Sequence, residues 1–215
     1  MGVEIAPPPR VFRRRGKELR ERALAALMLV PTLPLFVACA LAIKLEGLVD
    51  RDARGPVFFR EKRVSRGVVF DLLKFRTLNA SALASLGEGP THIAKLEKRG
   101  EVTRAGRVIR QWYLDELPQL INIVKGDMFL IGTRPWPIEL YEEHIAAGLT
   151  LKRDMPAGLV GPVQASKGRT EERDWMSLDQ EYWDEFRTRS ALGLLILDVK
   201  ILLRSGRVQL EHKGI

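Results

Sequence analysis

The chain has 215 residues, a formal net charge of +8 at pH 7 and a single cysteine. This length suits one domain with a substantial core, and the charge favours an anionic partner: nucleic acid, acidic lipid headgroups or phosphorylated small molecules. The lone cysteine excludes an internal disulfide and a cysteine-built metal site, and the three histidines lack the spacing of metal ligands.

The first predicted element is an apolar helix at residues 23–43, a stretch without a charged residue. At about 1.5 Å per residue it is about 30 Å long, enough for the hydrocarbon core of a membrane. Pro31 and Pro34 lie near its middle and each removes a main-chain donor, and Thr32 is a candidate to donate its hydroxyl to a freed carbonyl. Basic residues flank both ends, whereas a spanning helix usually leaves positive charge on one side. The pattern favours a re-entrant helix that bends at the prolines over a simple span.

A β-hairpin is predicted next, at residues 57–64 and 68–77, because aromatic and β-branched residues lie on both sides of a break at residues 65–67. By the two-residue period of a strand, Lys74 and Arg76 project from the same face near its end. They form either a solvated basic edge or an anion site. Residues 78–102 mix glycine, serine and charge, which predicts a surface loop with a helical turn or two.

Two adjacent acids, Asp115 and Glu116, follow a predicted short helix at residues 103–113. Asp115 is a favourable N-cap for the apolar helix that comes next, and Pro118 is tolerated in a first turn, so capping alone would explain the acids. A helix N-terminus would also keep Asp115 ionised, and therefore nucleophilic or metal-binding.

Basic residues accompany the acids on both sides. Arg110 precedes them, and Arg134 follows within a stretch that two prolines stiffen. A rigidly held guanidinium suits the forked recognition of phosphate. Acids for a divalent cation, together with arginine and lysine for phosphate oxygens, are the groups that phosphoryl transfer requires.

The C-terminal third is predicted to contain helices at residues 137–148, from a capping box at residues 177–180, and at residues 191–203. The last helix could lie on the membrane surface or be buried in the core. Its relevant side chains are Ile196, Leu197, Lys200, Ile201, Leu202 and Arg204.

Four segments taken together resemble the bacterial sugar transferases, the monotopic phosphoglycosyl transferases that begin glycan assembly on polyprenyl phosphate. They are KFRT (74–77), RQWYLDELPQL (110–120), INIVKGDM (121–128) and GTRPWP (132–137). The segment GPVFFREKRV (55–64) and the proline-containing apolar helix fit the same family, over about residues 12–203. We therefore expect an α+β protein with a re-entrant N-terminal membrane helix (residues 1–50). A small helix-rich catalytic domain with a β-hairpin and membrane-surface amphipathic helices would follow (residues 51–215).

The resemblance implies a role for each matching residue. Asp115 would attack the β-phosphate of a UDP-sugar, release UMP and form a phosphosugar-aspartyl enzyme, and polyprenyl phosphate (undecaprenyl phosphate) would then take the phosphosugar. Glu116 would hold Mg²⁺ with Asp115. The phosphates would be bound by Lys74, Arg76, Arg110 and Arg134. Residues 155–164 resemble a substrate loop of the family but depart from it at Ala157 and Val160, and Gln164 and Arg169 are candidates for substrate contact.

These implications predict an enzyme at the inner (cytoplasmic) membrane, with its catalytic domain on the cytoplasmic face and with no nucleic-acid partner. It would start the assembly of an exopolysaccharide, an O-antigen, a capsule or a glycoprotein glycan. Two other classes stay open from the residues alone. One is a membrane-tethered nucleic-acid-binding protein, which the charge allows but the acid pair opposes. The other is a non-catalytic membrane adaptor in which Asp115 is only a cap.

Overall fold

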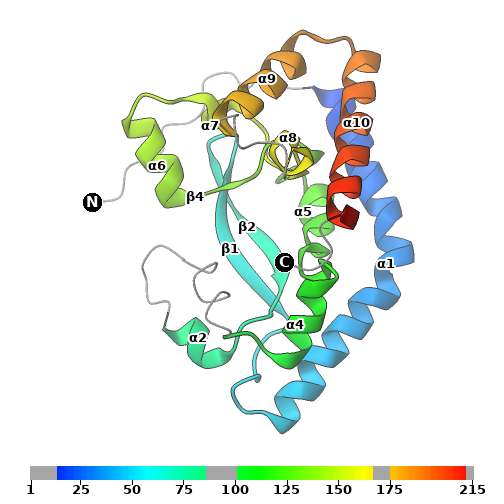
Figure 1. Ribbon diagram of the computed structural model, residues 1–215, viewed down its shortest axis with the longest axis vertical. Coiled ribbons are helices and arrows are strands. Elements are labelled where there is room, and N and C mark those ends of the chain that lie inside the picture. Colours follow the sequence, from blue (N-terminus) through cyan, green and yellow to red (C-terminus); the bar gives the residue numbers. More distant parts are fainter. Residues whose placement is uncertain (1–13, 86–100, 167–174, 212–215) are drawn as a thin grey trace. The chain divides into compact units, whose positions relative to one another are not determined.

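The computed structural model describes residues 14–85, 101–166 and 175–211. The fold is α+β, as predicted, with a long N-terminal helix, a hairpin and two small sheets (Figure 1). In chain order the elements are α1 (Arg15–Val49), β1 (Phe58–Ser65), β2 (Val68–Phe75), α2 (Ala80–Ala84), α4 (Arg104–Gln111), η1 (Leu114–Glu116), α5 (Gln119–Lys125), β3 (Phe129–Ile131), β4 (Trp136–Pro137), α6 (Ile138–Ala146), α7 (Leu151–Asp154), β5 (Gly158–Val160), α8 (Pro162–Ala165), α9 (Trp175–Thr188) and α10 (Ala191–Glu211).

Helix α1 contains the predicted apolar segment and extends beyond it at both ends. Pro31 and Pro34 both lie inside this one α-helix, so a bend at the prolines stays a prediction. Pro31 and Pro34 lack the N–H groups that would donate to the carbonyls of Leu27 and Val30. The hydroxyl of Thr32 donates instead to the carbonyls of Met28 (2.8 Å) and Leu29 (3.2 Å). Within the described ranges, α1 is the one helix that is long and apolar enough to cross a membrane.

The chain forms two compact units, and α1, the hairpin and α5 each contribute to both. One unit, which we call the acid-pair unit, contains residues 25–62 and 71–122. The other, the C-terminal unit, contains the chain up to residue 24, residues 63–70 and the chain from residue 123 onward. Neither unit coincides with residues 1–50, and a domain boundary at residue 50 stays a prediction.

The core of the acid-pair unit joins α1 to the hairpin and to the segment around the acids. Cys39, Ile43, Phe75 and Ile109 are buried together, and the rings of Phe36 and Phe75 meet edge to face with centroids 5.4 Å apart. The leucines on either side of the acid pair, at positions 114 and 117, pack against the same cluster. The apolar side of α1 therefore helps to fix the segment that carries the acids.

In the C-terminal unit, β3 and β5 pair in parallel, and Phe129 faces Gly158 in the register. This pairing depends on glycine, because a Cβ on Gly158 would lie 2.1 Å from the nitrogen of Gly132. The hairpin turn also belongs to this unit, with Arg66 and Gly67 at positive φ (52° and 70°), as two-residue hairpin turns require. The turn therefore confirms the predicted break at residues 65–67.

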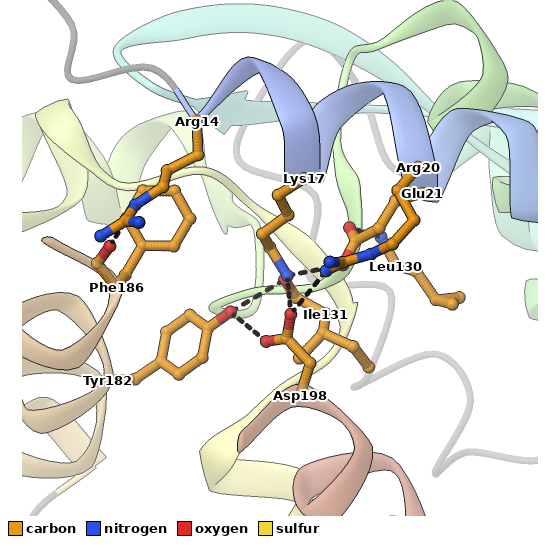
Figure 2. Close-up of polar contacts among 9 residues, drawn as sticks. All are labelled: Arg14, Lys17, Arg20, Glu21, Leu130, Ile131, Tyr182, Phe186 and Asp198. Carbon is orange, nitrogen blue, oxygen red and sulfur yellow. Dashed lines mark hydrogen bonds and ion pairs between the residues drawn. The ribbon is translucent and has the colours of Figure 1, made fainter. Parts of the chain in front are cut away.

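A buried network of charged side chains holds the other edge of β3 (Figure 2). Lys17 pairs with Glu21 at 2.5 Å and with Asp198 at 2.6 Å, and all three side chains are buried. Glu21 accepts a hydrogen bond from the N–H of Leu130 at 2.9 Å, and the hydroxyl of Tyr182 lies 3.1 Å from the carbonyl of Ile131. Side chains from α1, α9 and α10 thus bind this strand where a neighbouring strand would otherwise pair.

The C-terminal helices differ in detail from their predictions. Helix α9 already includes Trp175 and Ser177, so the predicted capping box at residues 177–180 is wrong. In α10, Ile201 is buried whereas Ile196 and Leu202 are exposed, so only part of the predicted apolar surface faces outward. Placement of α10 on a membrane surface stays a prediction.

Candidate active site

The acid pair lies in a 3₁₀ turn between two α-helices. Helix α4 begins at the predicted place, with Thr103 as its N-cap, and Tyr113 then reverses the chain at a φ of 55°, a conformation that is uncommon for a residue with a side chain. Asp115 and Glu116 follow in η1, and α5 starts only at Gln119. The prediction that Asp115 is the N-cap of the apolar helix is therefore wrong.

The ionisation of Asp115 is controlled by burial and not by a helix terminus. Burial and the neighbouring charge of Glu116 raise the pKa of Asp115 to about 6, whereas Lys74 and Arg110 act to lower it. The prediction that a helix N-terminus keeps Asp115 ionised is therefore wrong in its reason, because the pKa is raised and no α-helix begins at this residue. At pH 7 a group with this pKa is still about nine-tenths deprotonated, so Asp115 remains able to act as a nucleophile.

Lys74 and Arg110 are the basic residues that act on Asp115. Lys74 and Asp115 line one small cavity, which Phe59 and Leu83 also line. The ammonium of Lys74 lies 3.4 Å from the carboxylate of Glu61, a buried residue on the facing strand of the hairpin. The hairpin therefore places the Lys74 ammonium beside the acid pair, where Glu61 of the same hairpin holds it by an ion pair.

Arg76 also lines this cavity, but its guanidinium binds the main chain. Its side chain is buried, and its guanidinium donates to the main-chain carbonyls of Pro56 (3.0 Å), Leu78 (3.1 Å) and Ala53. All three nitrogens are thus engaged by the protein itself. We had predicted a phosphate-binding role for Arg76, and the structure instead makes it a clamp between the base of the hairpin and the segment before it.

Two buried or capping residues that position the acids were missed by the sequence analysis. The side-chain amide of Asn122 accepts from the N–H of Leu73 (2.9 Å) and donates to the carbonyl of Asp71 (2.7 Å), which fixes the start of α5 to β2. Glu46 accepts from the first main-chain N–H groups of α4, at 2.7 Å each. An amide within the apolar run INIV and an acid near the end of an apolar helix were the available signals.

The remaining predicted residues belong to the C-terminal unit. Arg134 is exposed and lies after β3, and Gln164 lies in α8 after β5. Because β3 and β5 are parallel, both residues follow the carboxyl ends of paired strands, where ligands of open α/β sheets commonly bind. Arg169 lies outside the described residues.

The acid pair was also predicted to hold Mg²⁺. Within residues 14–85, 101–166 and 175–211, no group of three or more acids, histidines or cysteines is placed to hold a metal ion. Two carboxylates nevertheless fit this ion, because Mg²⁺ is usually bound through one or two carboxylates together with substrate phosphates and water. The pair Asp115 and Glu116 has the composition that such a shared site requires.

A partly buried carboxylate with a second acid, a lysine and an arginine around it is typical of the class of proteins that bind an anionic substrate, and α1 is long and apolar enough to cross a membrane. The comparison with known families agrees with this class. The model of the family described as bacterial sugar transferase matches residues 12–211, and the chain belongs to this family.

Three relatives illustrate the similarity. The chain is 33% identical over 212 residues to UDP-glucose:undecaprenyl-phosphate glucose-1-phosphate transferase of Caulobacter vibrioides, which covers 93% of this chain and 71% of the relative. It is 33% identical to galactosyl transferase CpsE of Streptococcus agalactiae, over 79% of this chain and 39% of the relative. It is 38% identical to UDP-N-acetylgalactosamine-undecaprenyl-phosphate N-acetylgalactosaminephosphotransferase of Aeromonas hydrophila, over 63% of this chain and 29% of the relative. The chain therefore spans well under half the length of the last two.

Proposed function

We propose that this protein transfers a sugar-1-phosphate from a UDP-sugar to a membrane polyprenyl phosphate, the first step of glycan assembly. The observation that carries the proposal is the partly buried Asp115 with Lys74 and Arg110 acting on it. Family membership supports it, as does the similarity to relatives that are named as undecaprenyl-phosphate sugar phosphotransferases. The two rival classes are a nucleic-acid-binding protein and an adaptor. Neither function requires a partly buried carboxylate with two cations acting on it.

In the proposed reaction a carboxylate oxygen of Asp115 attacks the β-phosphorus of the UDP-sugar. A new oxygen–phosphorus bond forms as the bond from this phosphorus to the bridging oxygen breaks, and UMP leaves with the electron pair. An oxygen of the polyprenyl phosphate then attacks the same phosphorus, and Asp115 leaves as the free carboxylate. Two displacements by way of a covalent enzyme divide one difficult step into two easier ones.

The basic residues make this attack possible, because a carboxylate and a diphosphate repel each other. Lys74 and Arg110 would bind the phosphate oxygens and stabilise the charge that develops on them during each displacement. Asp115 and Glu116 are the residues that would hold Mg²⁺. When bound, this ion supplies further neutralisation of the phosphate charge. Arg134 and Gln164 are proposed to contact the rest of the nucleotide sugar.

The function is tested by supplying the purified chain, in detergent with Mg²⁺, with undecaprenyl phosphate and one UDP-sugar at a time. The panel contains UDP-glucose, UDP-galactose and UDP-N-acetylgalactosamine. We expect UMP to be released with at least one UDP-sugar. Release of more than one UMP per enzyme molecule should require the lipid phosphate. Failure to release UMP with every sugar of a wider panel would refute the proposal.

We further propose that α1 enters and leaves the same face of the inner membrane, with the catalytic residues on the cytoplasmic side. Exposed apolar side chains along the helix and basic residues at both ends support this topology. In a Cys39→Ser background, single cysteines introduced by Arg15→Cys and Arg51→Cys should both react with an impermeant thiol reagent in inverted membrane vesicles. Reaction of the two positions from opposite sides would show a spanning helix instead.

A further inference from the structure

A second buried ion pair lies in the C-terminal unit, outside the residues assigned above. The ammonium of Lys152, on α7, lies 2.5 Å from Oδ2 of Asp179, on α9, and the two residues are 6% and 4% exposed. Burial acts to lower the pKa of Lys152 and to raise that of Asp179, and the charge of each opposes the shift of the other. Oδ1 of Asp179 has no hydrogen-bond partner among the described residues, so Lys152 is the group that compensates this carboxylate.

Stability alone is a weak reason for such a pair, because apolar residues of similar volume often replace a buried ion pair without loss. The further contacts of Lys152 supply another reason. Its ammonium lies 3.5 Å from the carbonyl of Arg134 and 4.9 Å from the centre of the Trp136 ring. Lys152 thus contacts the residues on both sides of Pro135, in the segment that carries the predicted phosphate-binding arginine.

The other residues of the segment 133–136 are also fixed by contacts, whereas the side chain of Arg134 is exposed. Pro135 is buried, the N–H of Thr133 donates to the carbonyl of Pro156 at 3.3 Å, and the Trp136 ring packs against that of His144 at 4.5 Å. A fixed main chain beneath an exposed guanidinium is an arrangement that orients the guanidinium for a ligand.

We propose that Lys152 and Asp179 are positioning residues for Arg134: the pair fixes the main chain on both sides of Pro135, so that the guanidinium is presented to the diphosphate of the nucleotide sugar. Asp179 keeps Lys152 charged and in place, and Lys152 acts on the ligand only through Arg134. This inference rests on the proposed function, since it assumes that Arg134 binds the phosphates of that substrate.

The test is a double-mutant cycle on the affinity for UDP, measured by titration calorimetry on the full chain in detergent. Arg134→Ala should weaken UDP binding by about 10- to 100-fold, the range for a hydrogen bond to a charged group. Lys152→Met should weaken it at least about 10-fold, because misplaced binding groups lose much of their effect. In the Arg134→Ala background, Lys152→Met should cause no further loss, since residues that act as a unit are not additive.

Three further variants separate positioning from folding. Lys152→Met leaves the Asp179 carboxylate buried without a cation, so the double variant Lys152→Met/Asp179→Leu removes both charges; it should fold and still bind UDP weakly. Lys152→Arg keeps the charge and the donors and should restore affinity to within a few-fold. Asp184→Asn is the matched control, because Asp184 lies on the same helix in an exposed pair with Arg187 and should leave UDP binding unchanged.

Each outcome separates the two proposals. UMP release by the wild type together with independent, multiplying effects of Lys152→Met and Arg134→Ala would overturn the positioning role alone. Wild-type affinity in the variant Lys152→Met/Asp179→Leu would overturn it as well. Coupled effects on UDP binding without any UMP release would support the positioning role and overturn the proposed reaction. Absence of UDP binding by the wild type would overturn both.

Discussion

Replacing Asp115 with asparagine should abolish sugar-phosphate transfer while the protein stays folded. Asparagine has almost the same shape but lacks the anionic oxygen that forms the bond to phosphorus, and loss of a nucleophile commonly lowers kcat by about 10⁴-fold or more. Asp115 lies in a half-buried turn beside Glu116, which carries the same charge. Loss of the Asp115 charge therefore also removes a like-charge repulsion, so the variant should fold. UMP release under saturating UDP-sugar and lipid phosphate measures the loss, and the thermal midpoint measures folding.

A trapping experiment separates the role of nucleophile from that of metal ligand. With a UDP-sugar labelled in the β-phosphate and no lipid acceptor, the wild type should retain label on the protein and Asp115→Asn should not. Glu116→Gln should slow labelling without preventing it, because its role in the proposal is to support Mg²⁺ and not to form the bond. Asp71→Asn, in the pair that Asp71 forms with Lys62 at 2.8 Å, is the control and should label normally. Retention of label by Asp115→Asn would assign the nucleophile to another residue.

Local patterns predicted the elements around this site well. The hairpin and its turn followed from aromatic and β-branched runs on both sides of Arg66 and Gly67, and both residues have the positive φ that the turn requires. The short helix predicted at residues 103–113 is observed at Arg104–Gln111, where Thr103 caps the first turn. Signals that act over a few residues predicted these elements, although two predicted caps, at Asp115 and at residues 177–180, were wrong.

Other properties of the site could not be predicted because they depend on burial by segments distant in the chain. Period two predicts Lys74 and Arg76 on one face of the strand, but β2 ends at Phe75, and only the fold shows that main-chain carbonyls take up all of the Arg76 guanidinium. The pKa of Asp115 likewise depends on how far the folded chain buries it, which no motif describes. Lys152 and Asp179 are 27 residues apart, and nothing in the sequence pairs them.

Lys74→Met should lower kcat/KM by about 100-fold or more, the usual effect of removing one donor that stabilises developing charge in an acyl- or phosphoryl-transfer site. Lys74 acts on Asp115 and lines the same small cavity, so its loss removes a cation from the place where the diphosphate would approach the carboxylate. Lys62→Met is the matched control. Lys62 lies on the same hairpin and also pairs with an acid, Asp71, but it is exposed and outside that cavity, so its variant should keep near-wild-type turnover.

The contact of Lys74 with Glu61 decides how this result is interpreted. Glu61 is buried 3.4 Å from the ammonium, so Lys74→Met alone leaves a carboxylate without this cation and could lower activity by destabilising the hairpin. The double variant Lys74→Met/Glu61→Gln removes that buried charge and should recover the thermal midpoint but not the turnover. Recovery of turnover in the double variant would show that Lys74 serves folding only. If turnover stays low in the double variant, the charge of Lys74 is required for the reaction itself. The hairpin is then stable again but still lacks the cation that the attack of Asp115 on a diphosphate requires.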